Sequence, residues 1–170
     1  MSAFKPMGKI IVVAGKDSRE AVFLKRILSC AGKRNIAVLD SDGGVPNAPQ
    51  AAVLFLAGGP EPVSHPEKFA ECVMEYSLAR EGGLAGRENI VTYSVDQDGA
   101  DFTARNIRVA QDGQAAFEIV GVGIIGRVRL RTGDTAAVSP ALAAATAAIA
   151  AGIPFAEVLE ALNGIEIGRL

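Results

Sequence analysis

KIIVVAGKDSREAVFLKRILSCAGKRNIAVLD, residues 9–40, is the stretch of sequence that decides the fold. It reads as a strand, a tight turn, a helix and a second strand. Residues 10–13 are a β-branched run without polar alternation, which is typical of a central parallel strand covered on both faces. Apolar residues then recur at helical spacing over residues 19–30. The stretch therefore predicts a βαβ unit whose turn lies where α/β proteins bind phosphate.

The turn itself, AGKDSRE, does not have a phosphate-binding pattern. A phosphate loop needs several small residues whose backbone N–H groups converge on the anion, and usually a lysine followed by a hydroxyl residue. This turn matches neither GxxxxGK[ST] nor GxGxxG. Asp17, followed three residues later by Glu20, has the form of a helix N-cap with its partner, so a carboxylate would occupy the phosphate position. The sequence thus predicts the architecture of a nucleotide site without its chemistry.

The overall composition argues against several functional classes. The 170 residues are 49% hydrophobic and 21% charged, with a net charge of −2 and no long basic run, so we expect neither nucleic acid nor a membrane as a partner. The longest apolar stretch, residues 141–151, is too short to span a bilayer, and residues 1–9 lack the apolar core of a signal peptide. We therefore expect a cytoplasmic protein.

Metal and hydrolase chemistry have little support. Cys30 and Cys72 are isolated, each within a helical pattern, and are expected to be buried, reduced thiols. The one histidine, His65, lies in an S-x-x-E capping box at residues 64–67 and is expected at the surface. No GxSxG elbow is present, so no hydrolytic triad is expected. We assign no catalytic and no metal-ligating residue.

The rest of the first half is predicted as one strand and one helix. Residues 51–56, AAVLFL, form a buried strand. The capping box then opens a helix with an apolar stripe along residues 69–79, which stops at Gly82.

From residue 89 the pattern changes to strands separated by glycine-containing turns. The predicted strands are residues 90–95, 102–109, 116–122 and 126–132. In the last one, GRVRLRT, the side chains of Arg127, Arg129 and Arg131 point one way. Three arginines on one face could bind an acidic ligand, but a solvated face on an edge strand is the favoured interpretation.

Two helices follow in the last forty residues of the sequence. Ser139 is predicted as an N-cap followed by Pro140, and residues 141–151 are so rich in alanine that this helix can lie very close to its neighbours. Pro154 starts the second helix, which stops at Asn163.

Residues 89–170 resemble the second half of the central, ATP-binding domain of the Mur ligases, the peptidoglycan amino-acid-adding enzymes, and of their folylpolyglutamate synthetase relatives. IVTYSVDQDGADFTARNI resembles the strand and "aDf-a-ni" segment of that family. TGDTAAVSPALAAATAAIAAGIPFAEVLEAL resembles its helix pair, and GIEIGRL resembles its "gv-GR" motif. Residues 10–40 are then similar in position to the family's ATP loop, first helix and second strand.

The resemblance implies an α/β fold with three layers. Its sheet would be mostly parallel, of P-loop or Rossmann-like type, with antiparallel strands in the second half and two C-terminal helices. It also implies a single domain over residues 1–170, made of a βαβ half, residues 1–88, with a degenerate nucleotide loop and a strand-rich half, residues 89–170.

The resemblance also suggests where a nucleotide would bind. Gly15, Lys16 and Ser18 are what remains of the family's T-G-T-N-G-K-[TS]-[TS] loop, and Arg169 belongs to the segment that resembles "gv-GR". These four residues are the candidates for contact with ATP and Mg²⁺, should nucleotide binding be retained.

Other positions depart from the family. Its H-N-x-x-N motif is represented by Thr135, Ala136 and Ser139, and Val73 stands near the place of the lysine that becomes carbamylated. The chain also lacks counterparts of the N-terminal UDP-binding domain and of the C-terminal domain, so a homo-oligomer or a protein partner that replaces them is expected.

Two functions from different classes follow. The first is a non-catalytic binding or interaction module that has lost the ATP loop, in which Asp17 caps its own helix. The alternative is the ATP-binding domain or subunit of a Mur-type, ATP-dependent acid–amino-acid ligase with residual nucleotide binding through Lys16 and Ser18. The chain is not expected to be an enzyme on its own. A nicotinamide-type Rossmann domain is disfavoured because GxGxxG is missing.

Overall fold

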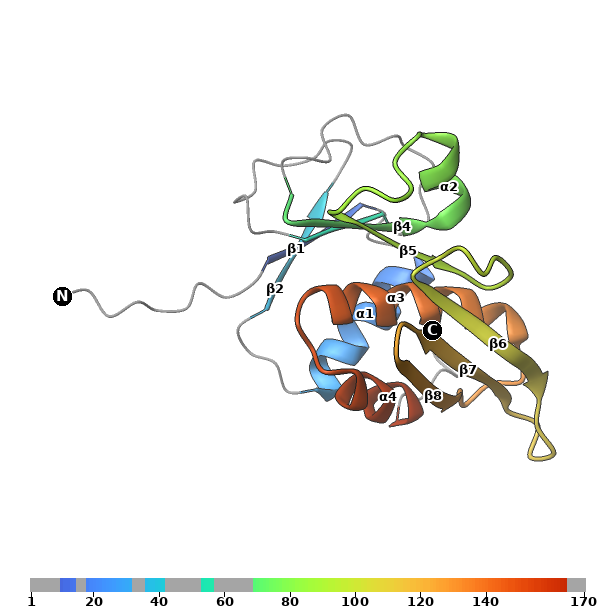
Figure 1. The fold of residues 1–170 in the computed structure, drawn as a ribbon. Coiled ribbons are helices and arrows are strands. Elements are labelled where there is room, and N and C mark those ends of the chain that lie inside the picture. Colours follow the sequence, from blue (N-terminus) through green and yellow to red (C-terminus); the bar gives the residue numbers. More distant parts are fainter. Residues whose placement is uncertain (1–9, 15–17, 32–35, 42–52, 57–68, 165–170) are drawn as a thin grey trace.

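The computed structural model describes residues 10–14, 18–31, 36–41, 53–56 and 69–164, which form one α/β unit (Figure 1). The elements are β1 (Ile10–Ala14), α1 (Arg19–Cys30), β2 (Ala37–Ser41), β3 (Val53–Leu56), β4 (Glu71–Glu75), α2 (Tyr76–Glu81), β5 (Ile90–Ser94), β6 (Phe102–Val109), β7 (Ala115–Gly121), β8 (Ile124–Arg129), the 3₁₀ helix η2 (Thr135–Ala137), α3 (Val138–Ala150) and α4 (Phe155–Gly164).

The strands join into one sheet in the order β2-β1-β3-β4-β5-β6-β7-β8. Neighbours from β2 to β6 pair in parallel, and the pairs β6–β7 and β7–β8 are antiparallel. The mostly parallel sheet with antiparallel strands in the second half, predicted from the sequence, is therefore confirmed.

The first strand is central, as its β-branched run predicts. Ile11, Val12 and Val13 are fully buried, and β1 pairs with β2 on one side and β3 on the other. Ile11 and Val13 pack into the core under α1, α3 and α4, whereas Val12 faces the smaller core under α2. Because successive residues of a strand point to opposite faces, this alternation gives the three layers visible in Figure 1.

Helix α1 has the predicted bounds, but two details of the prediction are wrong. Its N-cap is Ser18 and not Asp17, because the Ser18 hydroxyl accepts the N–H of Ala21 at 3.1 Å. The helix thus starts one residue later than a cap at Asp17 requires, and Glu20 falls at the second helical position, where it closes no capping box. Cys30, predicted as buried, is exposed.

The helix predicted from the capping box onward is wrong over residues 71–75. These residues form β4, a buried strand between β3 and β5, and only Tyr76–Glu81 is helical. Cys72, Val73 and Met74 are each at most 1% exposed. A short apolar run that is buried on both faces has no period of its own, so its residues fit a helical stripe and a central strand equally well. The capping box and His65 lie outside the described residues.

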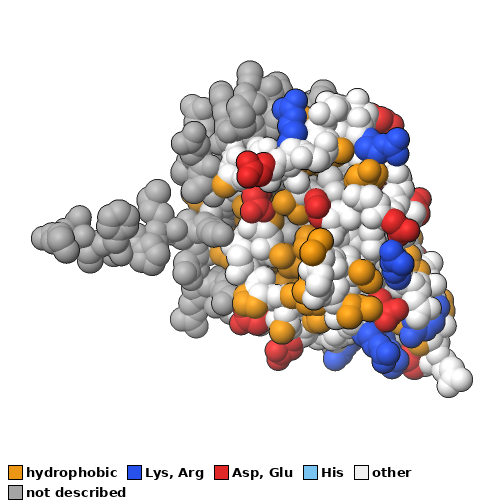
Figure 2. Space-filling model, viewed as in Figure 1, with side chains coloured by type: hydrophobic (Ala, Val, Ile, Leu, Met, Phe, Trp, Pro, Cys, Tyr) orange, Lys and Arg blue, Asp and Glu red, His pale blue; other side chains and the backbone are white. Residues whose placement is uncertain are grey.

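The strands of the second half agree with the sequence to within two or three residues at their ends. Strand β8 is at the edge of the sheet, with Arg127 and Arg129 exposed and Val128 and Leu130 buried. The predicted edge position and exposure of this face are therefore confirmed, and its solvated character stays a prediction. On the face seen in Figure 2, basic and acidic side chains are interspersed in this part of the molecule.

The parallel strands β5 and β6 are joined by residues 95–101 without a helix. A parallel connection normally needs a longer crossover. A short one suffices here because β6 begins beside the end of β5, where Ser94 pairs with Thr103. The Asp101 carboxylate closes the connection by accepting both the N–H and the hydroxyl of Thr92, at 2.8 and 3.1 Å.

Helix α3 begins earlier than predicted. Ser139 is inside its first turn, and the N-cap of α3 is Ala137, which makes no side-chain capping bond. The side-chain cap lies one element earlier, where the Asp134 carboxylate accepts the N–H of Ala136 at 3.0 Å at the start of η2. The predicted stop is correct, because Gly152 has a φ of 100°. The alanines along the helix are buried between the sheet and the neighbouring helices, which allows the close approach that the sequence predicts.

Helix α4 follows Pro154 and packs on β8. A Cβ atom at Gly126 would overlap the methyl groups of Leu159, with the Phe155 ring 2.9 Å away, so the close contact requires glycine. At the other end of α4, the Asn163 side chain accepts the N–H of Arg129 at 2.8 Å and donates to the carbonyl of Arg127 at 3.3 Å. One amide group thus pairs with the open edge of β8 as a further strand would.

Within the described part of the chain, no helix combines the length and the apolar character needed to cross a membrane.

Candidate functional site

The candidate site lies at the carboxyl edge of the parallel strands. The register places Ala14, at the end of β1, beside Leu56 at the end of β3, and places Glu75 at the end of β4 beside Tyr93. Because the strands are parallel, these ends share one edge of the sheet, and α1 begins at the same edge. Ligands of α/β proteins usually bind at such an edge.

Two helix N-termini meet at this edge although they are far apart in the sequence. Ser18 caps α1 and Asp134 caps η2, which leads into α3. The Arg19 guanidinium donates to the Asp134 carboxylate at 3.3 Å, across 115 residues of sequence. Both side chains are about half exposed, so the ion pair is screened by water and its value to stability is modest.

Two carboxylates act on a buried tyrosine at the same edge. Tyr93 is 5% exposed, and burial raises the pKa of its phenol well above the usual value, with further contributions from the charges of Glu20 and Glu75. Glu75 also caps α2, because its Oε2 atom accepts the N–H of Ser77 at 2.8 Å and that of Leu78 at 3.4 Å. Two negative charges, those of Glu20 and Glu75, therefore act on this part of the edge.

Glu75 is a site residue that the sequence alone did not predict. A helix over residues 64–81 would have placed it on a helix surface, whereas the strand β4 places it at the carboxyl edge. The available signal was an acid directly after the buried run of Cys72, Val73 and Met74.

The predicted nucleotide-binding residues are only partly within the described structure. Gly15, Lys16 and Arg169 lie outside it. Ser18 is at the carboxyl edge, where its hydroxyl caps α1.

The positions that correspond to family motifs are also placed. Thr135 and Ala136 form the start of η2 at the candidate edge, and Ser139 is half-buried in the first turn of α3. Val73 is fully buried in the core under α1 and α3, so its side chain does not line this edge.

Few groups among the described residues could hold ATP and Mg²⁺, and Gly15 and Lys16 of the turn lie outside these residues. In the first turns of α1 and η2 the only cationic side chain is Arg19, and it is paired with Asp134. No group of three or more acids, histidines or cysteines able to hold a metal ion occurs among the residues that the structure describes. The side-chain caps at the two helix ends and the nearby carboxylates both disfavour the binding of a polyphosphate.

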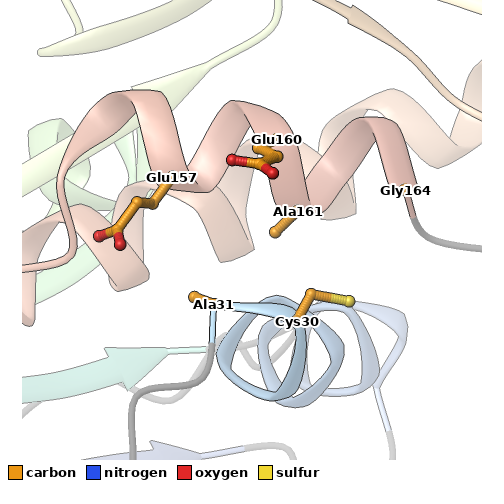
Figure 3. Close-up of a pocket in the computed structure, with 6 residues that line it drawn as sticks. All are labelled: Cys30, Ala31, Glu157, Glu160, Ala161 and Gly164. Atoms are coloured by element: carbon orange, nitrogen blue, oxygen red, sulfur yellow. The ribbon is translucent and has the colours of Figure 1, made fainter.

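A cavity of about 270 Å³ separates the C-terminal end of α1 from α4. Figure 3 shows Glu157 and Ala161 of α4 facing Ala31, with Cys30 beside it. This cavity is at the end of α1 remote from the candidate edge, and its acidic lining is unsuited to phosphate. It is therefore not a part of the candidate site.

Comparison with solved structures relates this arrangement to one group of enzymes. The fold is similar to that of MurF from Acinetobacter baumannii, with a TM-score of 0.63 and 14% identity over 95% of this chain and 47% of that one. A pseudomurein peptide ligase type C from Methanothermus fervidus gives a TM-score of 0.63 and 16% identity, over 95% of this chain and 50% of that chain. A murein peptide ligase from Psychrobacter arcticus gives a TM-score of 0.61 and 14% identity, over 96% of this chain and 48% of that chain.

The chain spans about half the length of these structures. No protein-family model matches it, and no curated protein matches it by sequence. The resemblance of the sequence to Mur ligases is thus confirmed at the level of the fold.

Proposed function

We propose that this chain, which has a Mur ligase fold, is a binding or interaction module that does not catalyse ATP-dependent ligation. The proposal rests on the position of the Asp134 carboxylate. It accepts the N–H of Ala136 at the start of η2 and pairs with Arg19 at the start of α1.

This carboxylate takes the role that a phosphate would have. A helix N-terminus attracts phosphate through its unpaired N–H groups and its partial positive charge. Here side-chain oxygens of Ser18 and Asp134 already accept N–H groups at both helix ends. The negative charge of Asp134 also repels a phosphate brought beside it.

Loss of the phosphate site would remove the ligase chemistry. Amide formation from ATP passes through an acyl phosphate, so it needs a phosphate cradle and a cation that neutralises the transferring group. The turn AGKDSRE lacks the glycines and the GK[ST] of such a cradle. The sequence of the turn and the contacts of Asp134 therefore support the same conclusion.

A second candidate is the alternative from the sequence, an ATP-binding domain or subunit of a Mur-type ligase. It is favoured by Glu75, a carboxylate at the end of a parallel strand, which is a kind of group that holds Mg²⁺. In this case Lys16 and Ser18 would contact the phosphates, and another polypeptide would complete the enzyme.

Differential scanning fluorimetry separates the two candidates. With ATP, ADP or a UDP-sugar at about 5 mM, with and without Mg²⁺, we expect the melting temperature to stay unchanged. A nucleotide bound with a Kd of about 50 μM would stabilise the fold by about 2.7 kcal/mol and raise the melting temperature by about 5–10 °C. Such a rise, lost in Lys16→Ala but kept in the control Lys25→Ala on α1, would establish the second candidate.

A variant tests the role of Asp134 directly. Asp134→Asn keeps a capping oxygen for Ala136 and removes the charge, so it should gain stabilisation by tripolyphosphate that the wild type lacks. If the variant responds no better than the wild type, Asp134 is not what excludes phosphate.

A further inference from the structure

A cavity of about 330 Å³ lies beside α2, on the face of the sheet opposite to α1 and α3. It is lined by Ser77, Arg80 and Glu81 of α2 and by Gln97 of the β5–β6 connection. At roughly 30 Å³ for each water molecule, it has room for about ten waters, or for one small organic molecule. The proposed function makes no use of this cavity.

Contacts hold the Ser77, Gln97 and Arg80 parts of the wall in place. The Gln97 amide donates to the Ser77 hydroxyl at 2.6 Å. The Tyr76 hydroxyl lies directly against Gly99, where no Cβ atom could fit, and the Arg80 guanidinium carbon is 5.9 Å from the centre of the Tyr76 ring. A pocket that is formed in advance loses less free energy when it orders around a ligand.

The four lining groups offer both donors and acceptors. Arg80 can only donate, the Glu81 carboxylate can only accept, and the Gln97 amide can do both. Ser77 accepts from Gln97 and so keeps its own hydroxyl proton to donate. The charges of Arg80 and Glu81 have opposite sign, so the described part of the lining has no net charge.

This lining discriminates between ligand classes. The four residues include no apolar or aromatic side chain, so neither an apolar molecule nor a stacked nucleobase gains much here. A polyphosphate gains little net attraction, because the repulsion by Glu81 offsets the attraction by Arg80. Hydroxyl groups both donate and accept, and several on one small neutral molecule would match all four side chains.

We propose that this cavity binds a neutral polyhydroxylated molecule of the size of a monosaccharide or cyclitol. Arg80 and Glu81 contact its hydroxyl groups at the rim, and the Ser77–Gln97 pair forms the fixed wall. This goes beyond the proposed function, because it identifies a ligand and a site for it.

The test is a ¹H–¹⁵N NMR titration of the whole chain with D-glucose and with myo-inositol. We expect saturable shifts, confined to the amides around Ser77–Glu81 and Gln97, with a Kd on the order of 1–10 mM. Arg80→Ala and Glu81→Ala should each weaken binding about tenfold. The controls Arg87→Ala and Glu88→Ala, which are exposed and outside the lining, should leave the Kd unchanged.

Shifts that do not saturate by about 50 mM, or that are unaffected in the Arg80 and Glu81 variants, would overturn the proposal. So would saturation by sodium acetate or ethylammonium chloride at lower concentration than glucose, since the ligand would then be charged. The nucleotide thermal shifts described above involve none of these four residues, so either idea can fail while the other stands.

Discussion

Replacement of Asn163 tests how the edge of the sheet is closed. Its side chain accepts the N–H of Arg129 and donates to the carbonyl of Arg127, and it also donates to the carbonyl of Leu159 within α4. Asn163→Ala removes all three hydrogen bonds and leaves two backbone groups of β8 without their partner. The change creates no cavity in the core, because residue 163 is exposed.

The cost can be worked out from these contacts. A neutral hydrogen bond contributes about 0.5–1.5 kcal/mol net, so the two bonds to β8 give about 1–3 kcal/mol. Water can replace part of this hydrogen-bond energy at an exposed edge, and the higher helix propensity of alanine offsets a further amount of about 0.5 kcal/mol. We therefore expect Asn163→Ala to lower the free energy of unfolding by about 1–2 kcal/mol, or the melting temperature by about 3–6 °C.

Urea unfolding and hydrogen exchange measure this effect together. The amide of Arg129 should exchange about tenfold faster in Asn163→Ala for each 1.4 kcal/mol lost. Asn163→Asp keeps the acceptor for Arg129 and should retain part of that protection. The control Glu160→Ala lies on the same exposed side of α4 without these bonds. Equal losses in Glu160→Ala and Asn163→Ala, or an unchanged Arg129 exchange rate, would refute the reasoning.

Three further changes test other parts of the structure. Gly126→Ala should cost about 1–3 kcal/mol in urea unfolding, because the new methyl overlaps Leu159 of α4, whereas Gly82→Ala has space and should cost much less. Ser18→Ala should lose about 0.5–2 kcal/mol through the α1 cap, and Ser18→Asp should restore it. Because the pKa of Tyr93 is raised in the folded chain, the folded chain keeps a proton that the unfolded chain loses above about pH 10. The free energy of unfolding should therefore fall by up to about 1.4 kcal/mol for each pH unit above about pH 10. Tyr93→Phe should remove this part of the loss, as measured by unfolding at several alkaline pH values.

The fold could be predicted largely because burial leaves a pattern in the sequence. The β-branched run of β1, the spacing of apolar residues in α1 and the alternation along β8 each identified their element. The prediction of strand β4 failed because Cys72, Val73 and Met74 form a strand that is buried on both faces, so apolar and polar residues do not alternate along it. The predicted start of α3 was wrong because a 3₁₀ turn capped by Asp134 precedes the helix. A serine followed by proline, as at Ser139, is the commoner pattern for a helix start.

The candidate site was less predictable because it depends on contacts between distant parts of the chain. Nothing local in the sequence pairs Arg19 with Asp134, and nothing marks Asn163 as a partner of β8. The acidic surroundings of Tyr93 likewise appear only when the register sets Glu75 beside it and α1 brings Glu20 near. Ser18 was identified as a site residue, but its role as a cap required the geometry of the helix end.

The short β5–β6 connection has a consequence for the order of folding. Strands β5 to β8 each pair with their neighbour in the chain, so their contacts close only small loops. The hydrogen bonds between Asp101 and Thr92 lie within the β5–β6 connection, the shortest link between two parallel strands of the sheet. Strand β1 instead pairs with β2 and β3 across longer segments of the chain, so these contacts close larger loops. Loop closure entropy therefore favours a transition state that is structured around β5–β8, with the β1 region joining later. Mutations near Asp101 should slow folding, while those in β1 should mainly speed unfolding.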